Sequence, residues 1–132
     1  MNVMYLPHIT RVYVRSNLDM LFIFGDNDKR QGFGGQAKEM RGEPNTYGIR
    51  VKKSPAMMPD AFYTDKEYND NIHKILFDLG HVQIIRKDYE RLVIPANGIG
   101  TGLANLNGKA PKTFKFLCDL MVDYGYTNGL IT

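Results

Sequence analysis

The sequence has little cysteine, no long apolar run and only a small excess of one charge. Its single cysteine, Cys118, permits no internal disulfide, which fits a reducing compartment. The apolar helical pattern around it predicts a packed thiol. No apolar run approaches the roughly 18 residues that span a bilayer, and the first residues lack a basic flank followed by an apolar stretch. We therefore expect neither a membrane protein nor a secreted one. A short chain without targeting signals suits a cytoplasmic protein of a bacterium or phage.

Charge and histidine spacing argue against two further classes. The net charge of +3 over 132 residues is too small to indicate a nucleic-acid-binding protein by itself. His8, His73 and His81 lack the spacing of metal ligands, and no cysteine joins them, so neither a metal nor a cofactor is expected. The length is near the commonest domain size, which predicts one domain over residues 1–132 with a substantial core.

Glycine, in contrast, is concentrated in two segments. Of the 13 glycines, six lie between residues 25 and 48 and four between residues 98 and 108. This clustering predicts two specific loops rather than general flexibility.

Strand and helix signals alternate along the chain. Strands are expected at 10–15, 20–24, 47–51 and 92–95, with a short edge strand at 126–132. Helices are expected at 35–40, at 64–79 with a shorter piece to about residue 86, and at 111–124. The second of these helices opens on a capping box of Thr64 and Glu67, and Gly80 is expected to end or kink it. The alternation predicts an α/β layer sandwich in which both glycine loops follow buried strands, where ligands bind in open α/β sheets.

The first glycine loop, residues 25–37, reads GDNDKRQGFGGQA. Its Gly-x-Gly-x-x-Ala segment matches a dinucleotide-binding pattern, but the segment begins eight residues after Phe24. The next strand ends in Lys52 and Lys53 rather than in an acid that would hold a ribose. The context therefore argues against a Rossmann site.

A phosphate-binding loop fits the same residues better. Gly34 and Gly35 leave consecutive amides free to face an anion at the start of the next helix, and Arg30 supplies a bidentate phosphate partner, as does the arginine at position 41. Asp26 and Asn27, directly after a buried strand, would hydrogen-bond a sugar. The alternative is a loop that only makes turns and caps the helix.

The second glycine loop, residues 95–109, reads PANGIGTGLANLNGK. It is not a Walker A loop, because five residues rather than four separate Gly102 from Gly-Lys, and Ala110 follows where a hydroxyl is required. The alternating Gly98, Gly100 and Gly102 still allow an amide-lined wrap around a diphosphate. A glycine-rich turn without a ligand is the alternative.

Taken in order, the two loops resemble those of macro domains, an ADP-ribose-binding family, and most closely the terminal ADP-ribose protein glycohydrolase type. The likeness rests on Gly-Asp-Asn and Gly-Gly in the first loop, on Ile-Gly-Thr-Gly-Leu in the second, and on the Lys-Lys pair between them, and it covers most of residues 21–121. It implies a three-layer α/β/α sandwich with a mixed sheet and a cleft for ADP-ribose or a related nucleotide. The residues expected to bind that ligand are Asn27, Arg30, Gly32, Phe33, Gly34, Gly35, Gln36, Asn97, Gly98, Ile99, Gly100, Thr101, Gly102 and Leu103.

The resemblance also implies a catalytic lysine. In the glycohydrolase branch a lysine attacks the anomeric carbon of the ribose, and Lys52 is the matching position; burial or a neighbouring cation would lower its pKa as that attack requires. The aspartate that follows Gly-x-Gly-Leu in that branch is Ala104 here. Asp26 and Asn27, or Asp65 beyond the long loop, are the candidate replacements, so catalysis stays open.

Three functions are therefore kept. The first is binding of ADP-ribose or a related nucleotide, with removal of ADP-ribose from a modified protein or nucleic acid as the catalytic form. The second is a non-catalytic reader, or a protein that sequesters an ADP-ribose-like signalling nucleotide. The third, a module for single-stranded nucleic acid, predicts a steep salt dependence that the small net charge does not favour. In each case the 53–63 loop, with Pro55 and Pro59, is expected to act as a lid.

Overall fold

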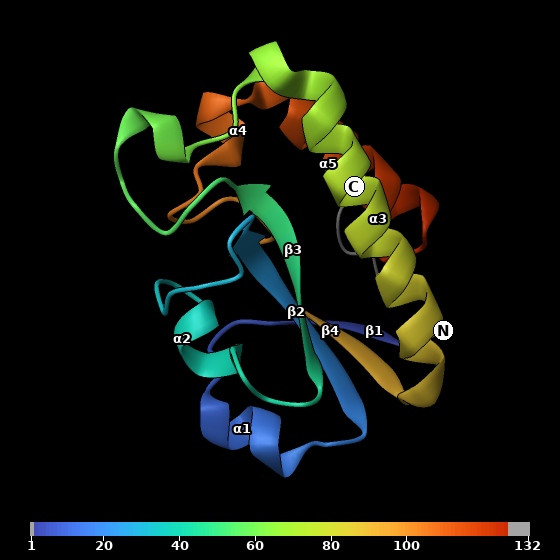
Figure 1. Cartoon of the computed structure of the whole chain (residues 1–132). Coiled ribbons are helices and arrows are strands. Elements are labelled where there is room, and N and C mark those ends of the chain that lie inside the picture. The colour runs from blue at the N-terminus through green and yellow to red at the C-terminus, as the bar shows by residue number, and fades with distance from the viewer. Residues whose placement is uncertain (1, 127–132) are drawn as a thin grey trace.

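The computed structural model describes residues 2–126 as an α/β domain (Figure 1). Its strands are β1 (Val3–Leu6), β2 (Met20–Asn27), β3 (Thr46–Lys52) and β4 (Arg91–Pro95). Its α-helices are α1 (Arg11–Ser16), α2 (Ala37–Met40), α3 (Tyr68–Ile85), α4 (Leu106–Lys109) and α5 (Pro111–Asp123). Short 3-10 helices cover Pro59–Ala61, Asp65–Glu67 and Arg86–Asp88.

The four strands form one sheet in the order β1-β4-β2-β3. Every pair of neighbouring strands runs parallel, with Leu21 opposite Leu92 between β2 and β4. Antiparallel pairing within residues 2–126 is confined to one bridge between Lys52 and Phe62. The expected α/β sandwich is confirmed, although the sheet is more uniformly parallel than the mixed sheet of our expectation.

Helices cover both faces of this sheet, which makes three layers (Figure 1). Leu21 and Ile23 of β2 pack in a core with residues of α3 and α5. Phe22 and Phe24, which alternate with them, pack with residues of α1 and α2 on the other face. Because both faces are buried, residues 20–24 of β2 form a continuous apolar run. Each such buried side chain contributes roughly 1.5–3 kcal/mol to stability.

The first expected strand, at residues 10–15, is wrong. Those residues form α1, and the Thr10 side chain accepts a hydrogen bond from the Tyr13 N–H at 3.2 Å. The alternating pattern is misleading because only Val14 in this helix is buried, while Arg11 reaches across to Glu43. Strand β1 lies earlier, over Val3–Leu6, and the sequence analysis missed it.

Two local predictions are also wrong, and a third is wrong in part. The helix does not end at Gly80, since α3 runs on to Ile85; a glycine weakens a helix without necessarily breaking it. Thr64 makes no capping hydrogen bond; the adjacent Asp65 caps α5 instead, accepting from the backbone N–H groups of Lys112 (2.9 Å) and Thr113 (3.0 Å). Cys118 is exposed rather than packed.

The other expected elements are found. Strands β2, β3 and β4 and helices α2, α3 and α5 lie where the sequence pattern predicts them, within a few residues at each end. The suggested edge strand at 126–132 lies outside the described residues, except for Tyr126. Among residues 2–126, no helix combines the length and apolar character that crossing a membrane requires.

Candidate functional site

The sheet topology opens a cleft between the loops that follow two neighbouring strands. The chain leaves β2 toward α2, which packs on one face of the sheet, and leaves β4 toward α4 and α5, which pack on the other. Because β2 and β4 are adjacent and parallel, the loops that follow them diverge at the same edge. A divergence of this kind is where open α/β sheets bind ligands. Figure 1 shows the loops after β2, β3 and β4 gathered at that end of the sheet.

The cleft at this edge has a volume of about 460 Å³. It is lined by both glycine loops and by the start of the 53–63 loop, through Gly25, Asp26, Asn27, Gln31, Gly32, Gly34, Gly35, Gln36, Ala37, Arg41, Lys52, Pro55, Pro95, Asn97, Gly98, Gly100, Thr101, Gly102, Leu103 and Ala104. Most of the residues expected at the site are therefore brought together. Arg30, Phe33 and Ile99 are not among those that line it.

Glycines allow the walls of the cleft to approach one another. A Cβ at Gly34 would lie 2.9 Å from Leu103 Cδ1 of the opposite loop, and one at Gly32 would lie 2.9 Å from Pro55 Cβ. Gly32 also has φ +93°, a conformation that favours glycine. The two glycine loops and the 53–63 loop are thus in contact around the cleft because these positions lack side chains.

The backbone of the second loop presents free donors. Gly98 and Gly100 have φ values of +90° and +86°. Within residues 2–126, the N–H groups of residues 99–104 donate to no backbone or side-chain acceptor. Unpaired amides of successive residues in a loop with left-handed glycines form a concave site for anions. This wall of the cleft can therefore bind a phosphate or diphosphate.

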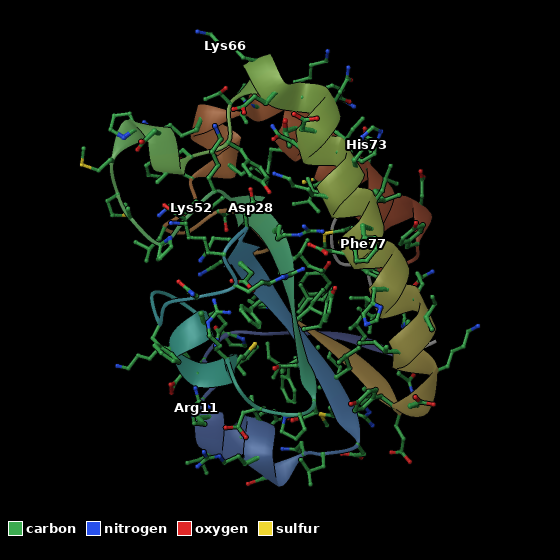
Figure 2. The ribbon with its side chains drawn as sticks, in the orientation of Figure 1. Arg11, Asp28, Lys52, Lys66, His73 and Phe77 are labelled. Carbon is green, nitrogen blue, oxygen red and sulfur yellow. The ribbon has the colours of Figure 1, made fainter. Side chains whose placement is uncertain are left out.

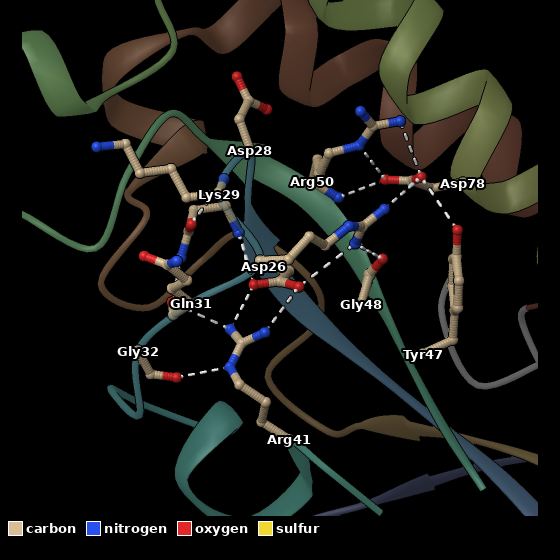
Figure 3. A network of polar contacts seen from close by, with 12 residues as sticks. Asp26, Asp28, Lys29, Gln31, Gly32, Arg41, Tyr47, Gly48, Arg50 and Asp78 are labelled. Atoms are coloured by element: carbon tan, nitrogen blue, oxygen red, sulfur yellow. Dashed lines mark hydrogen bonds and ion pairs between the residues drawn. The ribbon is translucent and has the colours of Figure 1, made fainter. Parts of the chain in front are cut away.

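Asp26 forms the centre of a buried ion-pair network (Figure 3). Its carboxylate accepts from Arg41 at 2.5 and 3.2 Å, from Arg30 at 3.3 Å and from the Asn27 N–H at 2.8 Å. Arg41 also donates to the carbonyl of Gly32 at 2.7 Å. Asp26 therefore anchors the first loop to the end of β2, and its oxygens are occupied by cations rather than open to act as a base.

Arg30 joins this network to a second buried acid. It donates to Asp78 of α3 at 2.8 Å and to the Gly48 carbonyl. Asp78 is fully buried and also accepts from Arg50, through the backbone N–H at 2.7 Å and through Nε at 3.0 Å. Arg30 has φ +53°, a backbone conformation that is uncommon for residues other than glycine. It supports the site from beneath rather than facing a ligand.

Lys52 is the buried cation of the cleft. It is 6% exposed, and burial lowers the pKa of its ammonium group from the usual value. Nζ donates to the carbonyl of Ala56 at 2.5 Å and lies 3.3 Å from Met57 Sδ. It is also 4.8 Å from the ring centroid of Phe62. Figure 2 shows Lys52 at the end of the sheet where the loops gather.

The 53–63 loop is thus tied to the site at Lys52. Ala61, Phe62 and Tyr63 at its end are buried, and the Tyr63 hydroxyl donates to Asp28 at 2.5 Å. Met57, in contrast, is 59% exposed. The loop is therefore anchored at its carboxyl end, and its exposed middle covers the lysine.

The remaining predicted residues fall into two groups. Asn27 and Gln36 line the cleft, but their side chains already have partners: Asn27 Nδ2 donates to the Gln31 carbonyl at 2.7 Å and Gln36 Nε2 to the Ile9 carbonyl at 2.9 Å. Phe33 is 64% exposed, and Ile99 is buried in the core. An exposed aromatic next to the cleft stays a candidate contact for a ligand.

Ala104 lines the cleft and supplies no acid or base. Asp65, suggested as a replacement for the missing aspartate, is engaged as the cap of α5 and does not line the cleft. Asp78 was missed by the sequence analysis. The sequence does carry a sign of its role, since Asp78 lies at helical spacing on the same face as the buried Ile75, Leu79 and Val82. A carboxylate on a buried helix face requires cationic partners, so this position predicts a buried ion pair.

The fold and the cleft define a three-layer α/β domain with an open cleft at the carboxyl edge of a parallel sheet. Residues 4–120 match the family described as "Family of unknown function (DUF7831)", and the chain belongs to this family. Searches of the curated proteins and of the solved structures gave no match.

Proposed function

We propose that this protein binds ADP-ribose or a related nucleotide in the cleft between its two glycine loops. The observation that carries the proposal is the run of unpaired N–H groups at residues 99–104, in a loop that lines, opposite the first glycine loop, a cleft of about 460 Å³. That volume is in the range of sites for nucleotide-sized ligands, about 300–1,000 Å³. A diphosphate needs several donors at once, and a loop of amides supplies them.

The charges around the cleft support the same ligand class. Arg41 and Lys52 are its basic side chains and Asp26 its acidic one, so the lining charge is 2 − 1 = +1. The Asp26 carboxylate is already neutralised by two arginines. A bound diphosphate would therefore meet a positive field and no free carboxylate.

Lys52 favours a second, catalytic candidate at the same site. A lysine with a lowered pKa is neutral more often and is then a nucleophile. Its amine would attack the anomeric carbon of a ribose, forming a C–N bond as the bond to the modified target breaks and the departing group takes a proton. Water would then release the sugar and restore the lysine. Ala104 offers no general base for the second step, so binding without turnover is the first candidate.

Calorimetric titration with ADP-ribose tests the binding proposal. Gly102 lines the cleft, and a Cβ there would meet no protein atom within 4 Å. Gly102→Val should therefore leave the fold intact and weaken ADP-ribose binding at least about tenfold, or about 1.4 kcal/mol. Gly80, on α3, also has no atom within 4 Å of such a Cβ and does not line the cleft, so Gly80→Val is the matched control.

The outcomes separate the candidates. No heat with wild-type protein at millimolar ADP-ribose contradicts both candidates, and equal loss in the two glycine variants contradicts the placement of the ligand. Catalysis is tested by incubating the protein with an ADP-ribosylated substrate and measuring free ADP-ribose. Turnover that disappears in Lys52→Gln favours the enzyme, whereas binding without release favours a reader.

A further inference from the structure

A second, smaller pocket lies at the opposite edge of the sheet. It has a volume of about 180 Å³ and is lined by residues that include Asn2, Arg86, Lys87, Tyr89, Glu90 and Arg91. Strand β4 links the two sites, because Arg91 at its start lines this pocket and Pro95 at its end lines the cleft. At about 3.3 Å per residue, these two ends are roughly 13 Å apart.

Arg86 is the unusual residue of this pocket. It is 7% exposed, yet it forms no ion pair within residues 2–126. Five of the six other arginines, Arg11, Arg15, Arg30, Arg41 and Arg50, form ion pairs with carboxylates, and the sixth, Arg91, is exposed.

The contacts that Arg86 makes within the described residues do not include a carboxylate. Nη1 donates one long hydrogen bond, 3.4 Å, to Gln83 Oε1. The guanidinium lies 5.1 Å from the ring centroid of Tyr126. Burial raises the pKa of Tyr126 to about 12 even though the neighbouring arginine lowers it in part. The phenol is therefore neutral near pH 7 and cannot balance the arginine.

The rest of the pocket lining is also cationic. Lys87 and Arg91 are exposed and form no ion pair within the described part of the chain, and Glu90 is the one acid among the lining residues. The lining charge is therefore 3 − 1 = +2. A buried charge is costly unless it is paired and hydrogen-bonded, and the planar fork of an arginine matches the oxygens of a phosphate.

We infer that this pocket is a binding site for a phosphate group, held by the guanidinium of Arg86 with Lys87 and Arg91 at its rim. This pocket would hold phosphate whatever ligand the first cleft binds. The pocket, with its volume of about 180 Å³, is large enough for a phosphate monoester as well as for the free ion.

The test is an NMR titration of the full chain with inorganic phosphate. We expect a saturable shift of the Arg86 Nε–H resonance and of the Tyr89 amide at phosphate concentrations of about 10 mM or below. Lys87→Gln/Arg91→Gln should weaken that binding about tenfold or more, since both positions are exposed and the fold does not depend on them. Arg15→Gln/Lys66→Gln removes the same two charges from exposed positions outside the pocket and should leave the affinity unchanged within about twofold.

Three results would overturn the inference. One is the absence of a shift at Arg86 in the wild-type protein. Another is an equal loss of affinity in the two double variants, which would mean a general effect of net charge. The third is a shift confined to the amides of Gly100 and Gly102, which would place phosphate only in the first cleft. Arg86→Lys, which keeps the charge and removes the fork, should weaken phosphate binding at least about fivefold if it folds.

Discussion

Replacing Asp26 with asparagine should destabilise the protein strongly, because it breaks the ion-pair network beneath the first loop. The Asp26 side chain is 2% exposed and that of Arg41 is 16% exposed. Removing one partner of a buried ion pair costs about 3–5 kcal/mol, since the other charge stays buried. Asparagine has nearly the same shape, so the loss measures the charge rather than a cavity.

The contacts of the two arginines place the expected loss toward the lower end of that range. Arg30 keeps its ion pair with Asp78 at 2.8 Å, and Arg41 keeps its hydrogen bond to the Gly32 carbonyl at 2.7 Å. We therefore expect a decrease of about 3 kcal/mol in the free energy of unfolding. At roughly 3–4 °C per kcal/mol for a domain of this size, the Tm should fall by about 10 °C.

Urea denaturation at pH 7, followed by far-UV circular dichroism, measures this change; the chain has no tryptophan to serve as a fluorescent probe. The matched control is Asp119→Asn, which removes an exposed partner of Lys115 at a similar distance, 2.7 Å. Its midpoint should not change measurably, because exposed ion pairs contribute little. In a double-mutant cycle, the loss of stability caused by Asp26→Asn should be smaller by about half or more when Arg41→Gln is already present. A loss below about 1 kcal/mol, or one equal to that of Asp119→Asn, would show that the buried network around Asp26 does not stabilise the fold.

Three further changes test other parts of the structure. Asp65→Ala should destabilise the protein by about 1 kcal/mol near pH 7 through loss of the α5 cap. Burial raises the pKa of Asp65, but the hydrogen bonds from Lys112 and Thr113 outweigh burial and lower the pKa below 3.8, so the stabilising contribution of Asp65 should disappear as the pH falls below that value. Urea midpoints of wild type and variant that do not converge between pH 7 and pH 2 would contradict this prediction. Lys52→Gln should change how the free energy of unfolding depends on alkaline pH. The pKa of Lys52 in the folded state lies below the unfolded value of 10.5, so the stability of the wild type relative to the variant should rise with pH up to 10.5. A difference in stability that does not change with pH would contradict the burial of the ammonium group. Gly48→Ala places a Cβ 2.5 Å from Asp26 Oδ2, so it should lower the free energy of unfolding by about 1–3 kcal/mol and weaken ligand binding in the first cleft. A variant with wild-type stability and wild-type affinity would show that Asp26 can move without affecting the fold or the cleft.

Local patterns predicted much of the fold and most of the cleft residues. Strand β2 is readable because a strand covered on both faces is apolar at every position, and α5 because proline begins it and glycine follows it. Residues 10–15 were mistaken for a strand because alternation of valine and arginine is compatible with either structure when only one side chain, Val14, is buried. The positions of the glycines predicted the walls of the cleft, since glycine marks close approach of backbone segments.

The α/β class, the two glycine loops and their place after buried strands can be read from the residues alone, because they depend on local periodicity and on residues with special backbone freedom. The roles of the charged side chains depend on tertiary contacts. Arg30 and Asp26 are brought to the same buried network by the pairing of β2 with β3 and by the packing of α3 on the sheet. Arg86 lines the second pocket without a carboxylate partner among residues 2–126. The partners of a long charged side chain come from distant segments, so neither its neighbours in the sequence nor its residue type reveals whether it holds the fold together or faces a ligand.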